Sequence, residues 1–187
     1  MKDENTIRFK RKHVMKRIAI VGNGGGGKTT LSRGLGAALG LPVYHVDSLQ
    51  FQPGWKVTPQ VETSQKLDQI AQTNAWIIDG FGTKEVIERR FNGADTIVFV
   101  DFPLWRHYGW AFKRQMGSFK KVREELPENC PEFSLQYTWK LFRAIWRVHK
   151  EYRPWFREKI QALPPSTQCF HIKSKQDWQK FYAHYCE

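Results

Sequence analysis

The chain has 187 residues, of which 41% are hydrophobic and 14% aromatic, enough to bury one α/β core. Its formal net charge is +12, from 30 Lys and Arg against 18 Asp and Glu, so we expect either a polyanionic ligand or partner or an unusually solvated surface. The apolar runs are strand-sized, well below the ~18 residues of a membrane helix, and the three cysteines lack C-x-x-C spacing. These features argue against a membrane span, a disulfide framework and a zinc site, and we expect a cytoplasmic protein without a membrane partner.

The first residues differ in character from the rest. Residues 1–14 are polar and basic and contain no apolar stretch typical of a secretory signal. We predict that they form a disordered basic extension. No internal repeat or long linker interrupts the remainder, so residues 15–187 are predicted to form a single domain.

The most informative segment comes next. Residues 22–29 read Gly-Asn-Gly-Gly-Gly-Gly-Lys-Thr and fit the phosphate-binding pattern G-x-x-x-x-G-K-[ST]. Glycines leave no Cβ in the way and accept positive φ, so successive N–H groups can surround a phosphate. A β-branched run, 17–21, precedes the motif, and residues 30–39 carry Leu and Ala at helical spacing. Strand, loop and helix are the context that this motif requires, whereas a flexible glycine-rich linker is the alternative.

We therefore predict a nucleotide-binding loop that is mobile without its ligand. Lys28 is expected to reach the β and γ phosphate oxygens as a catalytic residue, and the Thr29 hydroxyl to bind Mg²⁺. The predicted nucleotide-binding residues are Gly22, Asn23, Gly24, Gly25, Gly26, Gly27, Lys28, Thr29 and Thr30.

Further strands and helices alternate along the chain. Strands are expected at 43–46, 75–80, 95–101 and 168–173, and helices at 84–91 and after Thr58-Pro59, with Thr58 as the cap. Continuous apolar strands separated by helices predict a parallel sheet covered on both faces. In such a sheet ligands bind beyond the carboxyl ends of the strands, where Gly22, Asp47, Asp79 and Asp101 are expected to lie.

Three aspartates are candidates for chemistry at this edge. Asp79 ends the apolar strand at 75–80 and is predicted to orient Mg²⁺ through water, although a cap of the following turn is an alternative. Asp101 is a second candidate for the same role. Asp47 is predicted to accept the proton of an acceptor hydroxyl or to hold the acceptor, whereas with Ser48 it could also merely start a turn.

Several segments together resemble a known family. They are 22–30, 42–47, 53–55, 76–80, 94–97, 101–103, 130–132, 153–154 and 173–174. Over residues 15 to about 185 the chain resembles the bacterial topology-modulation proteins, relatives of adenylate kinase among the nucleoside-monophosphate-kinase-like P-loop proteins. The resemblance implies a three-layer P-loop NTPase with a five-stranded parallel sheet, ATP and Mg²⁺ as ligands, and a mobile lid at about 114–133. We expect Arg114 and Arg123 to act as catalytic residues of that lid, because the segment from 117 to 127 is charged, weakly periodic and contains helix breakers.

The chain departs from the pattern of the family it resembles at some positions. Family members usually have arginine where this chain has Leu104 and Trp110, and adenylate kinases follow the equivalent of Phe81 with Pro-Arg. The favoured function is an ATP- and Mg²⁺-dependent phosphotransferase acting on a small, nucleotide or other, acceptor. The missing arginines and the positive charge favour the alternative, a nucleotide-switched nucleic-acid-binding or regulatory ATPase.

A basic aromatic segment covers residues 135–157. Its aromatic and apolar residues recur every three or four positions, which predicts one helix with a broad aromatic face, and a stripe of cations runs beside it: Lys140, Arg143, Arg147 and Lys150. A solvated surface, contacts with nucleotide phosphates, and a nucleic-acid or partner surface are the three interpretations. Nucleic acid is not the favoured partner.

Overall fold

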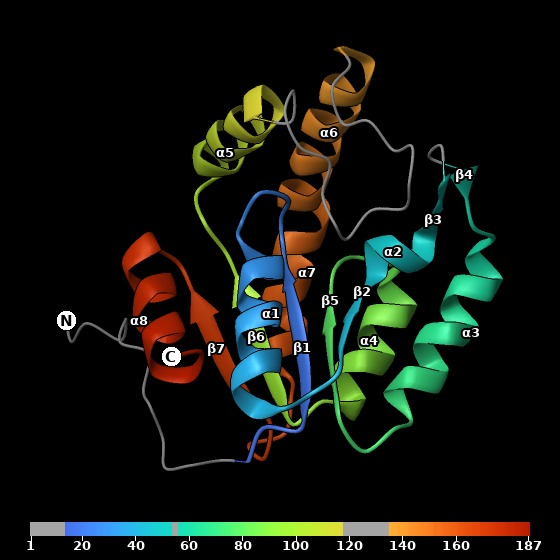
Figure 1. The fold of residues 1–187 in the computed structure, drawn as a ribbon, viewed down its shortest axis with the longest axis vertical. Coiled ribbons are helices and arrows are strands. Elements are labelled where there is room, and N and C mark those ends of the chain that lie inside the picture. The colour runs from blue at the N-terminus through green and yellow to red at the C-terminus, as the bar shows by residue number, and fades with distance from the viewer. Residues whose placement is uncertain (1–13, 54–55, 118–134) are drawn as a thin grey trace.

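A parallel sheet forms the centre of the molecule. The computed structural model describes residues 14–53, 56–117 and 135–187. The five strands are β1 (Arg17–Gly22), β2 (Val43–His45), β5 (Trp76–Asp79), β6 (Thr96–Val100) and β7 (Gln168–Ile172), in the spatial order β2-β5-β1-β6-β7. All four neighbouring pairs are parallel, so the carboxyl ends of the strands lie at one edge (Figure 1).

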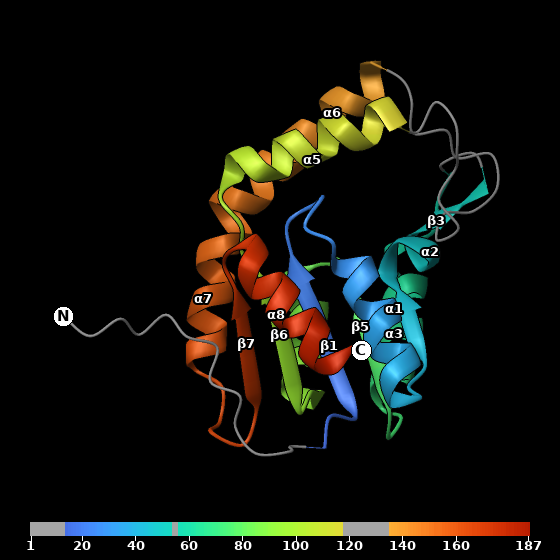
Figure 2. The same ribbon diagram turned by 60° about the vertical axis from the view of Figure 1, so that its left-hand side comes forward.

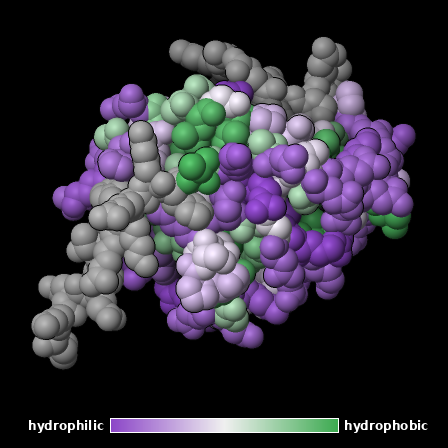
Figure 3. Space-filling view, turned by 90° about the horizontal axis from the view of Figure 1, so that it is seen from below, coloured by the Kyte–Doolittle hydropathy of each residue, from purple (hydrophilic) through white to green (hydrophobic). Residues whose placement is uncertain are grey.

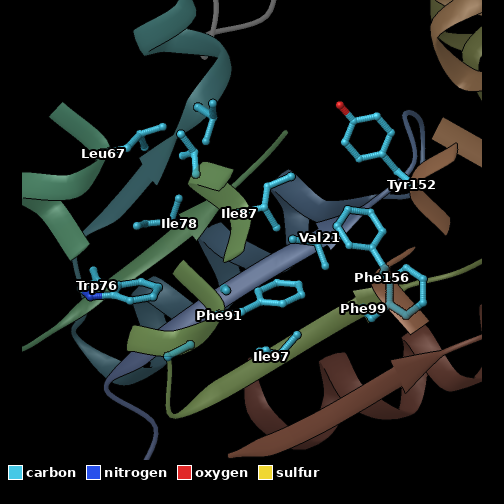
Figure 4. Close-up of a cluster of buried hydrophobic side chains, with 14 residues drawn as sticks. Val21, Leu67, Trp76, Ile78, Ile87, Phe91, Ile97, Phe99, Tyr152 and Phe156 are labelled. Carbon is cyan, nitrogen blue, oxygen red and sulfur yellow. The ribbon is translucent and has the colours of Figure 1, made fainter. Parts of the chain in front are cut away.

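Helices cover both faces of this sheet. Alternate residues of β1 point to opposite sides, so Ile18 joins the core beneath α1 (Lys28–Leu39) and α8 (Lys175–Tyr185). Val21 joins the other core, beneath α3 (Gln60–Ala71), α4 (Lys84–Gly93) and α7 (Arg153–Gln161) (Figure 4). Aromatic rings such as Phe91, Phe99 and Phe156 fill that second core. This three-layer α/β arrangement confirms the fold class predicted from the sequence.

Two helices extend beyond the carboxyl edge of the sheet, and we call them the roof. They are α5 (Leu104–Gly117) and α6 (Leu135–Arg147), which lie side by side above the P-loop (Figure 2). A π-helical turn, η2 (Val148–Tyr152), joins α6 to α7. The helix predicted over this segment is therefore present, but its hydrogen-bonding pattern changes from α to π at this turn. Pro154 has no N–H to donate one turn back, so the chain widens into a π-helical turn before it.

A small hairpin between β2 and α3 is absent from the sequence-based prediction. Its antiparallel strands are β3 (Phe51–Gln52) and β4 (Lys56–Val57), and the short helix α2 (Val46–Gln50) precedes it. The Thr58 N–H donates to the Gln50 carbonyl oxygen at 2.9 Å, so Thr58 belongs to the hairpin. The N-cap of α3 is Pro59, one residue later than predicted, and the Thr58 side chain does not cap the helix.

Some predictions fall on parts of the chain that the structure does not describe. The basic extension lies outside the described residues except for Val14. Residues 114–117 are the last turn of α5, whereas 118–133, with Arg123, lie outside the described residues, as does the side chain of Arg114. The single-domain assignment of residues 15–187 stays a prediction. Within the described ranges, no helix combines the length and apolar character needed to cross a bilayer.

Candidate active site

A cleft of about 910 Å³ opens at the carboxyl edge of the sheet, below the roof. Its lining includes the whole segment 22–30, together with Asp47 after β2 and Asp79 at the end of β5. The parallel sheet places these side chains together because neighbouring strands end at the same edge. We call this edge, with the P-loop, Asp47 and Asp79, the floor of the cleft.

The backbone of the P-loop requires glycine at specific positions. Gly22 has φ of 140°, and a Cβ there would overlap the carbonyl oxygen of Val100 on the neighbouring strand. Gly25 and Gly27 have φ of 73° and 74°, in the left-handed region, and Gly27 is the N-cap of α1. The Lys28 Nζ donates to the Asn23 carbonyl oxygen at 2.9 Å, so the ammonium lies across the loop. The loop and the amino end of α1 thus form a positively polarised cradle for an anion.

Both roof helices hold the P-loop from above. The Asn23 side chain donates to the Ile145 carbonyl oxygen of α6 at 2.9 Å and accepts from the Gly24 N–H at 2.8 Å. From α5, His107 Nδ1 lies 2.8 Å from the Gly24 carbonyl oxygen, to which it donates. The two peptides around Gly24 are therefore held by the side chains of Asn23, which is anchored to the α6 backbone, and of His107. A run of glycines lacks such a restraint on its own.

His107 makes this contact as a neutral side chain. Only 1% of the residue is exposed, and burial lowers the pKa of His107 to about 4, with the positive charge of Lys28 acting in the same direction. The neutral imidazole has one N–H, which the contact with the Gly24 carbonyl oxygen places on Nδ1. His107 can thus orient the loop without adding a positive charge to it.

Asp79 is a buried carboxylate at the carboxyl end of β5, which lies next to the central strand β1. Its side chain is 4% exposed, and its Oδ2 lies 3.3 Å from both Ser32 Oγ and His45 Nδ1. Ser32 lies on α1, three residues after Thr29, and His45 is paired directly with Asp79 in the sheet register. The carboxylate is therefore placed beside the start of α1, and His45 contributes to that placement.

An arginine beneath the floor was not anticipated from the sequence. Arg90 of α4 is 1% exposed, and both terminal nitrogens donate to the Gly80 carbonyl oxygen at 3.3 Å. Burial lowers the pKa of Arg90 to about 10, and the charge of Asp79 partly opposes that shift. Arg90 therefore stays protonated at neutral pH and steadies the turn that follows Asp79.

The acceptor side of the cleft lies toward β2. Asp47, on the first turn of α2, is half-buried and lines the cleft with Gln50, Phe51 and Phe81. The opposite wall is mainly apolar and includes Leu141, Ala144 and Ile145 of the roof and Val148 of η2. A polar carboxylate opposite an apolar wall is suited to a small ligand that carries hydroxyl groups on one side.

Asp101, the second candidate for the metal, is fully engaged elsewhere. It lies 2.5 Å from Arg153 Nε, 2.7 Å from Arg157 and 2.9 Å from His171 Nε2. Burial alone would raise its pKa, but the hydrogen bonds from these three side chains hold it at about 2. Asp101 ties β6 to α7 and β7, so the geometry favours Asp79 for the magnesium role.

The donors of the floor fit a magnesium ion that keeps most of its water. The Thr29 hydroxyl and the Asp79 carboxylate line the same cleft and are hard oxygen donors, which Mg²⁺ prefers. Among the described residues there is no group of three or more His, Cys, Asp or Glu side chains that could hold a metal alone. Phosphate oxygens and water would have to supply the remaining ligands, as is usual for Mg²⁺ in kinases.

Several solved kinases have a similar structure. A shikimate kinase from Acinetobacter baumannii in complex with shikimate matches with a TM-score of 0.59 and 16% identity, over 91% of this chain and 90% of that chain. A shikimate kinase from Bacteroides thetaiotaomicron matches with a TM-score of 0.55 and 13% identity, over 91% and 96%. A gluconokinase from Sinorhizobium meliloti matches with a TM-score of 0.51 and 11% identity, over 94% and 95%. The chain therefore has a kinase-like P-loop fold.

No protein-family model matches the sequence, and no curated protein sequence matches it either. The resemblance to the topology-modulation proteins stays a prediction. Identities this low establish the fold and not the reaction.

Proposed function

We propose that the protein is an ATP- and Mg²⁺-dependent phosphotransferase that acts on a small acceptor with a hydroxyl or phosphate group. The observation that carries this proposal is the meeting of Lys28, Asp47 and Asp79 in one cleft at the carboxyl edge of the sheet. A phosphate cradle alone would suit any P-loop protein, but a carboxylate across the cleft from the cradle is suited to an acceptor. The solved kinases of similar fold support a small-molecule acceptor.

The P-loop and Lys28 would position the phosphates and neutralise their charge. The N–H groups of the loop and the ammonium of Lys28 are the donors available on the floor, and pre-positioned donors contribute most to phosphoryl transfer. His107 and Asn23 keep these donors in place through their contacts with Gly24. Thr29 and, through water, Asp79 would hold Mg²⁺, which when bound neutralises charge that develops on the phosphate oxygens.

Asp47 would act on the acceptor. Its half-buried carboxylate faces the cleft, so it could accept the proton of an acceptor hydroxyl or hold that hydroxyl in place. Gln50 adds a second polar contact on the same side, and the apolar wall of α6 closes the other. The acceptor would then be held between a polar floor and an apolar wall, in the same cleft as the phosphate cradle.

The test is transfer of labelled γ-phosphate from Mg·ATP to a panel of nucleoside monophosphates, hydroxy acids and polyols, beside a reaction without acceptor. We expect one class of acceptor to give labelled product well above that control. Release of phosphate alone, equal with and without acceptors, would identify an ATPase and overturn the kinase proposal. Failure of ATP to bind at all would overturn the P-loop assignment as well.

A further inference from the structure

Four aromatic side chains of the roof are exposed. Trp105 and Phe112 of α5 are 68% and 58% exposed, and Trp139 and Trp146 of α6 are 66% and 49% exposed. In the part of the chain that the structure describes, the other exposed large hydrophobic residues are aliphatic and lie outside the roof. Three tryptophans and a phenylalanine gathered on two neighbouring helices form an apolar surface of the kind that binds a partner.

The four rings lie on the outer side of the roof. Seven residues, or about two helical turns, separate the two rings on each helix. On α5 they lie about 140° to 160° around the axis from His107, which contacts the P-loop. On α6 they lie a similar angle from Leu141, which lines the cleft. We call the surface formed by Trp105, Phe112, Trp139 and Trp146 the outer roof.

The two roof helices carry mostly positive charge. The sequences of α5 and α6 contain six arginines and lysines and no aspartate or glutamate: Arg106, Lys113, Arg114, Lys140, Arg143 and Arg147. In the turn that follows α6, Glu151 pairs with Arg147 at 3.1 Å and offsets that one cation. The Lys150 ammonium lies 5.1 Å above the ring of Trp146, and the Arg106 guanidinium 5.1 Å from that of Trp105. Figure 3 shows the opposite end of the molecule, where hydrophilic residues predominate around a smaller hydrophobic patch.

We propose that the outer roof docks onto the surface of an anionic lipid bilayer. Indole and phenyl rings partition into the interface between headgroups and acyl chains, and flanking Lys and Arg attract acidic lipids. Two helices that lie side by side present a broad ridge, which fits a planar surface (Figure 2). The contact is peripheral, and it is independent of the reaction proposed for the cleft.

Two other occupants fit less well. Single-stranded nucleic acid binds in a positive groove and stacks on free ring faces, whereas here a cation already covers one face of Trp105 and of Trp146. A second copy of the chain would bring two surfaces without acidic residues on α5 or α6 against each other, and their like charges would repel.

The sequence alone does not indicate this contact. Its pattern predicts no membrane partner and a single broad aromatic face for the helix within residues 135–157, which contains Trp139, Ile145 and Trp146. The structure buries Ile145 against the P-loop and leaves both indoles exposed. An amphipathic helix that uses both faces is difficult to distinguish by periodicity from one that uses a single broad face.

The proposal is tested by flotation of the full chain with vesicles of phosphatidylcholine alone or with about 30% phosphatidylglycerol. We expect binding to the anionic vesicles, weakened by salt, and a fall of about tenfold or more in Trp139→Ser/Trp146→Ser. The matched control is Val57→Ser/Val61→Ser, whose side chains are 68% and 69% exposed outside the roof. Arg143→Gln/Lys150→Gln should likewise weaken binding more than Lys175→Gln/Lys180→Gln on α8.

These substitutions are on the surface, so thermal unfolding should stay within a few degrees of the wild type. If one pair fails to fold, Trp105→Ser/Phe112→Ser on α5 carries the same test. Equal loss in roof and control variants, or no preference for anionic vesicles, overturns the proposal. Binding of an oligonucleotide in place of vesicles, or a dimer that the roof variants dissociate, overturns it in favour of that other partner.

Discussion

The floor and the roof of the cleft differ in how they are built and in the charge they carry. The floor combines buried strands, a glycine-rich backbone and the carboxylates Asp47 and Asp79. The roof consists of two helices rich in aromatic residues and cations, whose sequences contain no acidic residue. The floor thus combines the two carboxylates with the Lys28 ammonium, whereas the charged residues in the two roof helices are all positive.

The two regions should also differ in their tolerance of substitution. On the floor the backbone of one strand can lie very close to its neighbour, as at Gly22. Even the methyl group of alanine would overlap the Val100 carbonyl oxygen there. The outer roof has open space around it, and nothing lies within 4 Å of a Cβ added at Gly109. Substitutions on the floor and on the inner side of the roof should therefore impair the proposed activity more than substitutions on the outer roof.

The largest effect is expected from Asp47→Asn. Loss of the carboxylate should lower kcat by about 10²-fold to 10⁴-fold, the range for a general base, with little change in the Kd for ATP. Asp68→Asn is the matched control, because Asp68 pairs with Arg89 on the surface and lies outside the cleft lining. Rates are to be measured with the acceptor that the labelling panel identifies. An unchanged kcat would remove Asp47 from the chemistry.

The next largest effect is expected on the free energy of unfolding, which should respond in opposite directions to alanine at a floor glycine and at a roof glycine. Gly22→Ala should lower the free energy of unfolding by about 3 kcal/mol or more, because a Cβ at this φ would overlap the Val100 carbonyl oxygen. Gly109→Ala, inside α5, should raise it by about 0.5–1 kcal/mol, through better helix propensity. Urea unfolding measures both. Similar small effects at the two positions would contradict the strand contact at Gly22.

Lowering the pH should reduce the free energy of unfolding over two separate pH ranges. The folded-state pKa of Asp101 is about 2, below its ordinary value of 3.8. Its ion pairs therefore stabilise the fold above about pH 4, and this stabilisation is lost as the pH falls from about 4 to about 2. The shift corresponds to about 2 kcal/mol. His107 has a pKa lowered from 6.5 to about 4, so its contribution is lost earlier, as pH falls from 6.5 to 4. Urea unfolding across pH should show a smaller loss below pH 4 in Asp101→Asn, with the His107 window retained.

A smaller effect, on the affinity for ATP, is expected at the contact between the roof and the P-loop. His107→Phe removes the hydrogen bond to the Gly24 carbonyl oxygen, worth about 1 kcal/mol, so the Kd for ATP should rise about fivefold. His107→Asn keeps a donor on a shorter side chain and should lose less. Calorimetry measures both affinities, and equal affinities for wild type and His107→Phe would mean that the contact does not position the loop.

The sequence predicts the floor well because its signals are local. The glycine run, the β-branched strand before it and the aspartates that end apolar strands can be located without long-range information, and the structure places Lys28, Thr29, Asp47 and Asp79 around one cleft. Whether these residues perform the assigned roles stays a prediction. Arg114 and Arg123 belong to the same set of predictions, but their side chains lie outside the described residues.

The roof is predicted poorly because its signals are tertiary. His107 lies 83 residues from Gly24 along the chain, and Asn23 lies 122 from Ile145, so no window along the sequence contains either pair. Arg90 continues the buried stripe of Val86 and Ile87 at helical spacing, which is the one local signal that could have indicated its burial. The π-helical turn and the exposed indoles of α6 likewise depend on what packs against each face.

The most direct test of the division between floor and roof is the affinity for Mg·ATP of two lysine variants, measured by calorimetry. Lys28→Ala removes the ammonium that spans the P-loop and should cost about 2–4 kcal/mol of binding free energy. Lys150→Ala removes a cation that lies over Trp146 and should leave the affinity within about twofold of wild type. An unchanged affinity in Lys28→Ala, or an equal loss in both variants, would contradict the assignment of the floor as the nucleotide site.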